Sequence, residues 1–472
     1  MKAKIIISLL FLTTFFSASA QEYQYPTEPE VLENIRQWQD LKFGLFMHWG
    51  AYSIWGIVES WTLCSEDWEW NKRPPGISYN QYVKTYEMLP QYFNPVNFDP
   101  DKWSKAAKEA GMRYVVFTTK HHDGFCMFDS KYTDYKITDL SVPFHKNPKA
   151  DVANEIFKSF RKEGFPVGAY FSKPDWHHPD FWAPEWATPD RNVNYDTRKY
   201  PERWESFKDF TYHQIEELMT RFGKIDILWL DGGWVRPFGS AEEENKAAGQ
   251  RLWNQDVDMP RIAKMARGHQ PGIIIVDRSV TGIYENYRTP EQEIPEQTLP
   301  YPWETCMTMA GQWSFNAHDT YKSTHQIVQM LAQVVSRGGN LLLNIGPSPA
   351  GDFHPTAYQR LKEIGSWMKI NSEAIYGTKP VTPYHETKTV FTRKGKDLYT
   401  IYLADETEIN MPAEILIESF HPVKGGSVYL LGYNQSLTWK VAGKGCIIQI
   451  PASLQKNPPC RDAWILKFQP AL

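Results

Sequence analysis

The amino-acid sequence predicts an α/β fold, in which a (β/α)8-type TIM barrel is followed by a C-terminal antiparallel β-sandwich. Seven short and nearly continuous apolar runs lie between residues 43 and 346, as expected of parallel strands buried on both faces. Stretches with helical periodicity separate several of these runs, which indicates strands joined by crossover helices. From about residue 380 the helical pattern stops, and short alternating runs with turn residues replace it, as in a sandwich.

The barrel elements are predicted from these runs in chain order. The strands cover residues 43–49, 114–120, 166–172, 227–231, 273–278, 303–309 and 340–346. Amphipathic helices are predicted over 152–164, 205–223 and 325–339, and they close with Gly164, Gly223 and Gly338, as helix C-caps do. Seven such units predict an eight-stranded barrel with one weak strand. A doubly wound open sheet is the alternative, which is disfavoured because no G-x-G-x-x-G follows the first strand.

Two domains are predicted after a short leader. The barrel covers residues 21–378 and the β-sandwich 379–472, where the alternating runs are 389–395, 397–404, 413–420, 426–432, 437–450 and 463–468. A long insertion, 232–256, follows the fourth strand and should lie over its C-terminal end. Loops of that length are uncommon unless they bind something.

The N-terminus has the pattern of a secretory signal peptide over residues 1–20. Two lysines precede an apolar run, and small residues in an A-x-A-like pattern lead to Ala20, where cleavage is expected. The apolar run is too short to span a membrane as a helix. We therefore expect an exported protein, periplasmic or secreted, that is not membrane-spanning.

Composition excludes one class of partner and hints at another. The formal net charge of −4 shows no basic excess, so no nucleic-acid partner is expected. Aromatic residues make up 15% of the chain, with 19 Trp, and such rings suit the apolar faces of sugars as well as a protein core. The 5 cysteines lack metal-site spacing, so neither a zinc cluster nor a disulfide scaffold is expected.

Polar residues gather at the C-terminal ends of the predicted strands, where the active sites of parallel barrels are built. The first strand ends at His48, the second at Lys120-His121-His122-Asp123, the third carries Tyr170, the fourth ends with Trp229 and Asp231, and the fifth with Asp277 and Arg278. Such an arrangement predicts one polar pocket with aromatic walls.

Three interpretations of His48, His121 and His122 compete. Each one alone could be a core or capping residue. Together they could hold a metal ion, although no His-x-His pair stands at the first or second strand end. The third interpretation is recognition of hydroxyl groups, because imidazole both donates and accepts hydrogen bonds.

Asp231 closes an apolar strand and is followed by two glycines, which favours a functional role because a lone buried carboxylate is unfavourable. A retaining glycosidase needs a second carboxylate about 5 to 5.5 Å away, protonated to act as an acid. Glu291, Glu293 and Glu296 follow the fifth strand, whereas Glu304 begins the next one at the opposite barrel end. Strand direction favours Glu291, with Glu304 as the second candidate.

The motifs MHWG, KHHDGF, LWLDGGW, VDR and TPEQ, together with the signal peptide, resemble those of family 29 glycoside hydrolases, the α-L-fucosidases. The resemblance spans residues 35 to about 375 and fits the trailing sandwich. It implies a retaining exo-glycosidase that removes α-L-fucosyl residues from oligosaccharides or glycoconjugates and needs no metal or other cofactor. It also implies Asp231 as the nucleophile and Glu291 as the general acid/base.

The same resemblance implies the substrate-binding residues. Arg278 would keep Asp231 ionised, and Trp313 would cover the C5-methyl side of the sugar. The remaining pocket residues implied are His48, His121, His122, Tyr170 and Trp229. Because side chains alternate along a strand, the two adjacent histidines could face one sugar only if the chain bends there.

Two segments depart from the family pattern. In WGIVESWTLCSEDWEW, either Glu59 with Trp61 or Glu66 would meet the sugar hydroxyls, and the first pair is preferred. The insertion 232–256 stands where leaving-group subsites form, so linkage specificity is open. Three alternative functions also stay open: a hydrolase of another L-sugar such as α-L-galactose, a catalytically inactive carbohydrate-binding protein, and a metal-dependent barrel hydrolase.

Overall fold

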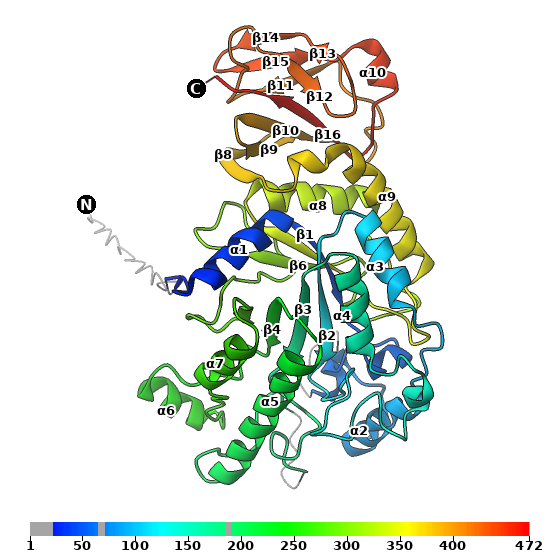
Figure 1. Ribbon diagram of the computed structural model, residues 1–472, viewed down its shortest axis with the longest axis vertical. Helices are drawn as coiled ribbons and strands as arrows, with labels where there is room; N and C mark the ends of the chain where they lie inside the picture. Colours follow the sequence, from blue (N-terminus) through cyan, green and yellow to red (C-terminus); the bar gives the residue numbers. More distant parts are fainter. Residues whose placement is uncertain (1–21, 65–70, 185–189, 472) are drawn as a thin grey trace, which may run out of the picture.

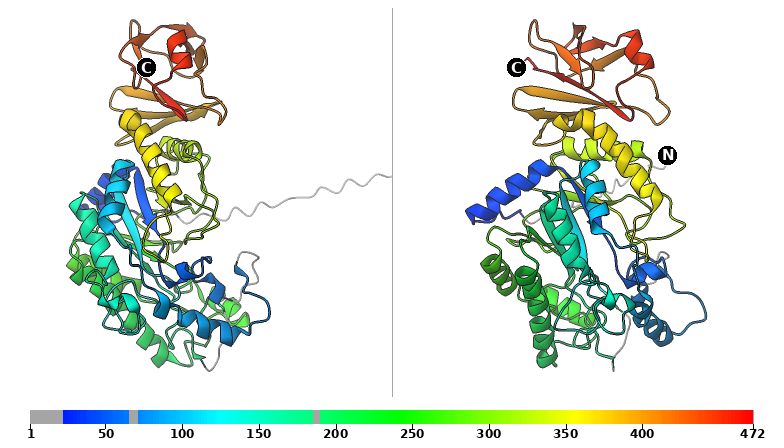
Figure 2. Two further views of the ribbon diagram at one scale, coloured as in Figure 1. Left: turned by 90° about the vertical axis from the view of Figure 1, so that its right-hand side faces the viewer. Right: turned by 45° about the vertical axis from the view of Figure 1, so that its right-hand side comes forward.

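The computed structural model describes residues 22–64, 71–184 and 190–471, so the predicted signal peptide and Glu66 lie outside the described residues. A large α/β lobe carries a smaller β lobe at one end (Figures 1 and 2). The α-helices are α1 (Pro29–Leu41), α2 (Tyr79–Glu87), α3 (Pro100–Glu109), α4 (Val152–Lys162), α5 (Pro201–Arg221), α6 (Ala241–Gly249), α7 (Met259–His269), α8 (Thr324–Ser336), α9 (Pro355–Asn371) and α10 (Ala452–Lys456).

The large lobe is built on a curled parallel sheet of seven strands. They are β1 (Phe43–Met47), β2 (Tyr114–Lys120), β3 (Val167–Ser172), β4 (Ile227–Asp231), β5 (Ile274–Asp277), β6 (Glu304–Thr308) and β7 (Asn340–Asn344). Their order in the sheet is β5-β4-β3-β2-β1-β7-β6, and every neighbouring pair is parallel. All seven predicted strands are therefore confirmed.

The gap between β5 and β6 is closed by residues 284–292. The backbone N–H of Asn286 donates to Ile275 of β5 at 2.9 Å, antiparallel to that strand. Farther along, the N–H of Glu304 in β6 donates to Arg288 at 2.9 Å, and here the two segments run parallel. This irregular segment takes the place of the weak eighth strand, so the predicted barrel is confirmed and the open-sheet alternative is wrong.

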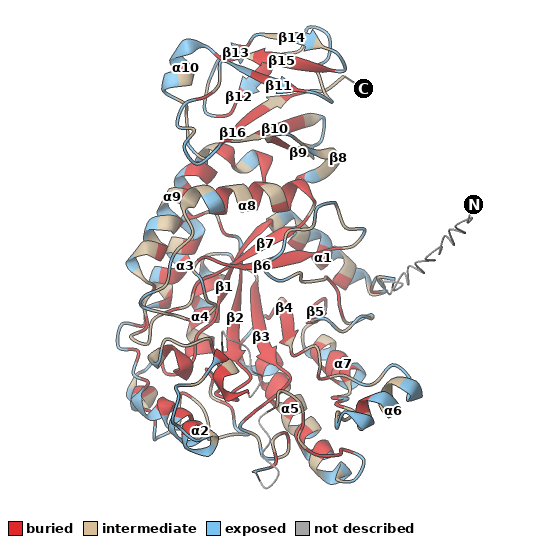
Figure 3. Cartoon of the chain, turned by 180° about the vertical axis from the view of Figure 1, so that it is seen from behind, coloured by how far each residue is buried: buried red, intermediate tan, exposed pale blue. Residues whose placement is uncertain are grey.

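Alternation along each strand divides the side chains between two cores. In β4, Ile227 and Trp229 point into the barrel, whereas Leu228 and Leu230 pack outward under the helices. Asp231 is the next inward position, since side chains of a strand alternate. Both faces of the strands are buried, as the red strands of Figure 3 show. The inward phase of each strand therefore decides which side chains reach the mouth of the barrel.

The three predicted helices are confirmed as α4, α5 and α8. The glycines predicted to follow them, Gly164, Gly223 and Gly338, have φ of 87°, 73° and 87°. That left-handed backbone is favourable for glycine because it lacks a Cβ atom. Ser323 and Gln326 form a capping box at the start of α8, so both ends of this helix are specified locally.

The small lobe consists of two antiparallel sheets packed face to face, which confirms the predicted β-sandwich. Its strands are β8 (Lys379–Glu386), β9 (Thr389–Lys394), β10 (Asp397–Leu403), β11 (Glu414–Ile417), β12 (Val428–Leu430), β13 (Ser436–Leu437), β14 (Trp439–Ala442), β15 (Gly445–Gln449) and β16 (Ala463–Phe468). The sheet orders are β13-β12-β16-β10-β9-β8 and β11-β15-β14. The sequence missed β8 because this edge strand contains Pro380 and Pro383 and has no buried residue.

Candidate active site

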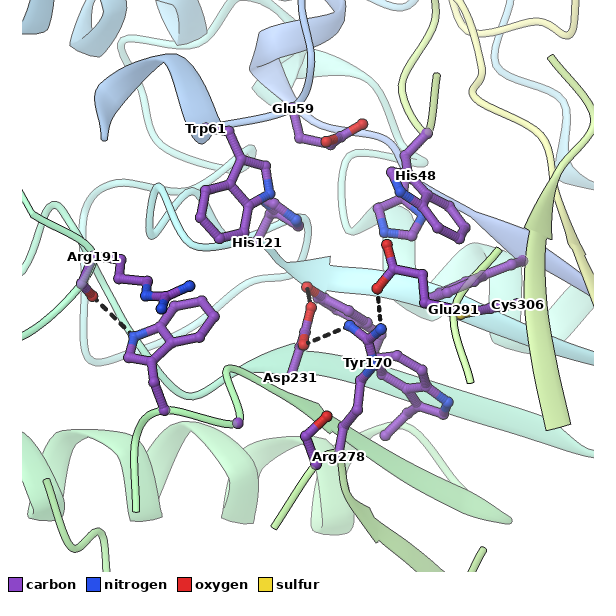
Figure 4. Close-up of a pocket in the computed structure, with 16 residues that line it drawn as sticks. His48, Glu59, Trp61, His121, Tyr170, Arg191, Asp231, Arg278, Glu291 and Cys306 are labelled. Atoms are coloured by element: carbon purple, nitrogen blue, oxygen red, sulfur yellow. Dashed lines mark hydrogen bonds and ion pairs between the residues drawn. The ribbon is translucent and has the colours of Figure 1, made fainter. Parts of the chain in front are cut away.

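A cavity of about 400 Å³ opens at the C-terminal ends of the barrel strands (Figure 4). This size lies within the range of small-molecule sites. Ten predicted site residues line it: His48, Glu59, Trp61, His121, Tyr170, Trp229, Asp231, Arg278, Glu291 and Trp313. His122, the remaining predicted residue, does not line the cavity and lies beside Asp231.

Asp231 ends β4 with both carboxylate oxygens held. Oδ1 accepts from the backbone N–H of Gly232 at 2.7 Å and from Arg278 Nη1 at 3.1 Å, while Oδ2 accepts from the Tyr170 hydroxyl at 2.8 Å. Burial alone would raise the pKa of this carboxyl, but the positive charge of Arg278, together with the hydrogen bonds from Gly232 and Tyr170, holds the pKa well below its usual range. The structure therefore keeps Asp231 ionised and fixed in orientation.

Arg278 joins the two candidate catalytic carboxylates. Its Nη1 contacts Asp231, and its Nη2 donates to Glu291 Oε2, so a single guanidinium group touches both (Figure 4). Glu291 stands on the segment that closes the barrel, and its side chain is 40% exposed at the cavity mouth. Two carboxylates within reach of one guanidinium group fit the separation of about 5 to 5.5 Å that retaining glycosidases use.

Glu304, the second candidate for the acid, lies elsewhere. It begins β6 at the closed end of the barrel, fully buried, and accepts hydrogen bonds from the Tyr114 hydroxyl at 2.6 Å and from Trp229 Nε1 at 3.3 Å. Burial raises the pKa of Glu304 to about 7. Glu304 does not line the cavity, and its hydrogen bond from Trp229 fixes the orientation of that indole ring.

The His-His pair is brought into the site by a β-bulge in β2. Thr118 pairs with Tyr170 and Lys120 with Phe171, so two steps along β2 match one step along β3. The extra residue reverses the phase of the strand. Lys120 consequently faces the outer core, where its ammonium lies over the Phe171 ring, and His121 faces the cavity.

A turn then brings His122 next to His121, with ring centroids 4.2 Å apart. The Nδ1 of His121 is 2.5 Å from Ser60 Oγ, while Nε2 of His122 is 3.9 Å from Asp231 Oδ2. Burial lowers the pKa of His122 to about 4 and the pKa of His121 well below its usual value. Both rings are therefore neutral near pH 7, and they face different parts of the site.

The other residues of the KHHDG motif build the turn. Lys120 pairs with Asp175 at 2.9 Å, both buried, and Asp123 accepts from the Tyr86 hydroxyl at 2.7 Å. Gly124 has a φ of 79°, and a Cβ atom there would lie 2.3 Å from Asp175 Oδ1. The lysine, aspartate and glycine are thus structural, and only the histidines reach the site.

The opposite wall carries His48, Glu59 and Trp313. The Nδ1 of His48 is 2.8 Å from Asn344 Oδ1, and burial lowers the pKa of His48 to about 4. Glu59 Oε1 accepts from the backbone N–H of Ser314 at 2.8 Å. Burial raises the pKa of Glu59 to about 8, so this carboxyl is protonated near pH 7 and can donate a hydrogen bond.

Aromatic rings form the floor and sides of the cavity. Tyr170 and Trp229 stack at 5.3 Å between ring centroids, and the Arg278 guanidinium lies 5.3 Å from the centre of the Trp229 ring. Trp61 packs edge-on against His122 at 5.1 Å. Glu59 and Trp61, the pair preferred in the 55–70 segment, thus both reach the cavity.

Sequence reasoning missed Arg191 and Trp234, which also line the cavity. The indole N–H of Trp234 donates to the backbone carbonyl of Arg191 at 2.9 Å. Trp234 follows Asp231 by three residues inside the insertion 232–256, a proximity that could have identified it. Arg191 comes from the loop after β3, and no local pattern marks it. Phe46, Gly233, Ser279 and Cys306 complete the lining.

The site combines one ionised carboxylate, one exposed carboxylate, neutral imidazoles and aromatic walls. Such a set can bind a polyol and transfer a glycosyl group through a nucleophile and an acid/base pair. Within the described ranges, no group of three or more His, Cys, Asp or Glu side chains could hold a metal ion.

Comparison with known proteins finds relatives over nearly the whole chain. The sequence model of the family "Alpha-L-fucosidase" matches residues 10–373, and that of the "Alpha-L-fucosidase C-terminal domain" matches residues 384–469. Among curated relatives, the chain is 27% identical to α-L-fucosidase of Branchiostoma floridae, over 98% of this chain and 99% of that protein. It is also 27% identical to human plasma α-L-fucosidase, over 95% and 92% of the two chains.

Solved structures agree over the same length. α-L-Fucosidase isoenzyme 1 from Paenibacillus thiaminolyticus superimposes with a TM-score of 0.74 at 30% identity, covering 94% of this chain and 100% of that one. Thermotoga maritima α-fucosidase in complex with fucose gives a TM-score of 0.70 at 27% identity, with the same coverage. The chain therefore belongs to the α-L-fucosidase family of glycoside hydrolases.

Proposed function

We propose that the protein removes terminal α-L-fucosyl residues from glycans with retention of configuration, using Asp231 as nucleophile and Glu291 as general acid/base. The observation that carries this proposal is the Arg278 guanidinium, which contacts both carboxylates at the mouth of one polar and aromatic cavity. The solved relative that holds fucose supports the choice of sugar.

The mechanism follows from the placement of the two acids. Asp231 attacks the anomeric carbon, and the glycosidic bond breaks as Glu291 gives its proton to the departing oxygen. A water molecule then attacks the glycosyl-enzyme, and Glu291 takes its proton while Asp231 leaves. Asp231 suits the first role because Arg278, Tyr170 and Gly232 keep it charged and oriented.

The residues of the cavity walls would bind the hydroxyl and methyl groups of the sugar. We infer that neutral His48, His121 and His122, together with protonated Glu59, hold the ring hydroxyls, and that these hydrogen bonds strengthen in the transition state. Trp313 lies 5.0 Å from the His48 ring and offers an apolar surface to the C5-methyl group. An apolar surface there favours fucose over L-galactose, which carries a hydroxyl at C6.

The direct test measures hydrolysis of an aryl α-L-fucoside and of the matching α-L-galactoside, with the product anomer followed by NMR. Hydrolysis of the fucoside with the α-anomer appearing first is expected, together with a much slower reaction of the galactoside. A first product in the β configuration would overturn the double-displacement assignment. No turnover of any fucoside would overturn the proposed activity.

Azide separates the two acids. Asp231→Gly should lose nearly all turnover, and azide entering the emptied face should give the β-fucosyl azide. Glu291→Ala should slow the reaction less for good leaving groups, and azide attacking the glycosyl-enzyme should give the α-fucosyl azide. The same azide anomer from both variants would contradict the assigned roles, and product NMR distinguishes the two.

We also propose that the protein is exported after cleavage near Ala20. The support is the N-terminal pattern of lysines, an apolar run and small residues. Searching the described residues for a helix long and apolar enough to cross a bilayer finds none. Edman sequencing of the protein recovered from the cell exterior or periplasm should begin at Gln21, and recovery from the cytoplasm with Met1 in place would refute export.

A further inference from the structure

A second cavity, of about 430 Å³, lies at the end of the barrel opposite the candidate active site. Its walls come from α1, from residues 298–303, from the end of α8 and from the start of β8, which meet where the barrel joins the sandwich (Figure 1). Lys42 precedes β1 and Trp303 precedes β6, so the cavity lies at the N-terminal ends of these strands. No described residue lines both this cavity and the catalytic pocket.

The lining of this cavity is positively charged. None of the described residues that line it is acidic, and four are basic: Arg36, Lys42, Arg337 and Lys379. Two of the four have a carboxylate partner outside the cavity. Arg36 Nη1 is 3.5 Å from Glu33 Oε2, and Lys379 Nζ is 3.0 Å from Asp40 Oδ1. The other two carry the positive charge that is left.

Lys42 is buried in the cavity wall without a partner for its ammonium group. Only 1% of the residue is exposed, and its Nζ makes no hydrogen bond or ion pair within the part of the chain that the structure describes. A φ of 63° also places its backbone in the left-handed region, which is unfavourable for a residue with a Cβ atom. An anion beside Nζ would offset the unfavourable burial of this charge.

Arg337 supplies a second donor at the same cavity. It is 7% exposed; its Nε donates to the carbonyl of Glu296 at 3.1 Å and its Nη1 to the carbonyl of Gln333 at 3.0 Å. These bonds fix the guanidinium plane, while Nη2 has no partner among the residues described. The charge of Glu296 acts on Arg337, so the two unpaired cations retain a net charge close to that of one. Such a site matches an anion with a single negative charge.

The remaining lining is largely apolar. Aromatic and aliphatic side chains surround the basic groups, and they are Tyr25, Leu32, Ile35, Leu299, Tyr301 and Trp303. A cavity of about 430 Å³ is far larger than an inorganic oxyanion and lies within the range of sites for small organic molecules. A ligand that fills it therefore needs an apolar body as well as a charge.

We propose that this cavity binds a small organic carboxylate, whose carboxylate group pairs with Lys42 and Arg337 and whose apolar body lies against Tyr301 and Trp303. Charge-assisted hydrogen bonds from an ammonium and a guanidinium group to a carboxylate are among the stronger ones in proteins. The site is separate from the catalytic pocket, so its test does not depend on the proposed hydrolysis.

Thermal unfolding tests the proposal with matched pairs of probes. The carboxylates are 3-phenylpropionate and hexanoate, and their controls are the corresponding amides, which copy the shape without the charge. At constant ionic strength, millimolar carboxylate should raise Tm with a saturable dependence on concentration, because a ligand that binds only the folded state stabilises it. The amides should leave Tm nearly unchanged. Absence of a shift with both carboxylates, or equal shifts with the amides, overturns the site.

Proton uptake provides a second measurement on the unmodified protein. Burial lowers the pKa of Lys42 to about 7, so its amine is mostly neutral at pH 8, and a bound carboxylate favours the charged form. Isothermal titration calorimetry at pH 8, in two cationic buffers that differ in ionisation enthalpy, should therefore show uptake of about one proton for each ligand bound. Binding without any proton uptake would contradict pairing with Lys42.

Lys42→Met removes the ammonium group and should weaken carboxylate binding about tenfold or more. Lys440→Met is the matched control, because Lys440 is exposed on β14 and outside the cavity, and it should bind as the parent does. Unchanged binding in Lys42→Met, or an equal loss in Lys440→Met, overturns the proposal. Inorganic phosphate is the last probe: a shift in Tm with phosphate and none with the carboxylates would assign the cavity to an inorganic oxyanion instead.

Discussion

At the residue scale, burial and one arginine set the charges of the catalytic pocket. Asp231 and Glu59 are both carboxyls in the same cavity, yet Arg278 holds the pKa of the first well below its usual range while burial raises the pKa of the second to about 8. Near pH 7 Asp231 is therefore a charged carboxylate, as the proposed nucleophile must be, and Glu59 is a neutral donor. Two carboxyl groups with pKa values moved apart are a common basis for division of roles.

Glu59→Gln tests this division, because glutamine copies the protonated acid in shape and keeps one acceptor for the Ser314 N–H. Near pH 6 to 7 the variant should retain kcat/KM within about tenfold of the parent. As pH rises through about 8, Glu59 ionises and adds negative charge near Asp231 and Glu291, so kcat/KM of the parent should fall. The glutamine variant should lack that fall.

The measurement is the pH profile of kcat/KM with a dinitrophenyl α-L-fucoside, whose leaving group needs little help from Glu291. Glu59→Ala is the control, since it leaves the Ser314 N–H without its carboxylate partner and should lose activity at every pH. Identical alkaline limbs in the parent and in Glu59→Gln would show that Glu59 does not control this titration.

Site residues could be predicted from the sequence where they continue the inward alternation of a strand. Trp229 and Asp231 follow the inward alternation of β4, and Arg278 continues the alternation of β5 two residues after Val276. Arg191 was not predictable, because it reaches the cavity from a loop whose path depends on tertiary packing.

At the element scale, the β-bulge and turn after β2 position the two histidines. The bulge is invisible in the sequence, because one extra residue in a buried strand leaves the apolar run unchanged. The segment 284–292 escaped prediction for a related reason. It pairs with β5 and β6 through a few bonds in opposite directions and has no continuous apolar run, although it carries Glu291.

Gly124→Ala should damage this turn. Gly124 has a φ of 79°, and a Cβ atom there would meet Asp175 Oδ1 at 2.3 Å, which would disturb the Lys120–Asp175 pair. The free energy of unfolding should fall by roughly 2 to 5 kcal/mol, from backbone strain plus overpacking. Activity should fall too, since His121 and His122 belong to this turn, which the N–H of Gly124 closes by donating to the carbonyl of His121.

Gly164→Ala is the matched control for this variant. Gly164 has a φ of 87°, but nothing lies within 4 Å of its added Cβ atom. It therefore reports strain alone, about 1 kcal/mol. Urea unfolding of both variants gives the comparison. Equal losses of stability would mean that the clash with Asp175 does not matter.

At the scale of the whole molecule, the barrel and the sandwich share one hydrophobic core. Tyr399 and Ile465 of the larger sandwich sheet belong to the same cluster of buried residues as Trp367 of α9. The indole N–H of Trp367 donates to the carbonyl of Ala463 at 3.0 Å across the joint. Each lobe buries apolar surface against the other at this interface, so we expect the two lobes to stabilise each other.

Lys42 lies near this joint and acts against stability. It is 1% exposed and lines a cavity of about 430 Å³ together with Lys379 and Pro380 of β8. Burial, followed by the charge of Lys379, lowers the pKa of Lys42 to about 7, whereas an unfolded chain would give the usual value near 10.5. Between these two values the unfolded state binds more protons, so stability rises with pH across that window.

Lys42→Met removes the unfavourable burial of an ammonium group while keeping a long, flexible side chain. At pH 7 and below, burial of the charged Lys42 ammonium destabilises the parent most. The free energy of unfolding of the variant should there exceed that of the parent by roughly 2 to 4 kcal/mol. The difference should shrink as pH rises toward 10, because the free energy needed to deprotonate Lys42 on folding falls as the pH approaches the unfolded-state pKa near 10.5. Lys379→Met removes the second cause of the lowered pKa of Lys42: this lysine is 62% exposed and pairs with Asp40 at 3.0 Å, so its loss should raise stability less than Lys42→Met does. Urea unfolding of the three proteins at pH 7 and pH 10 measures the effect, and a stability difference that does not vary with pH would exclude the titration of Lys42 as its cause.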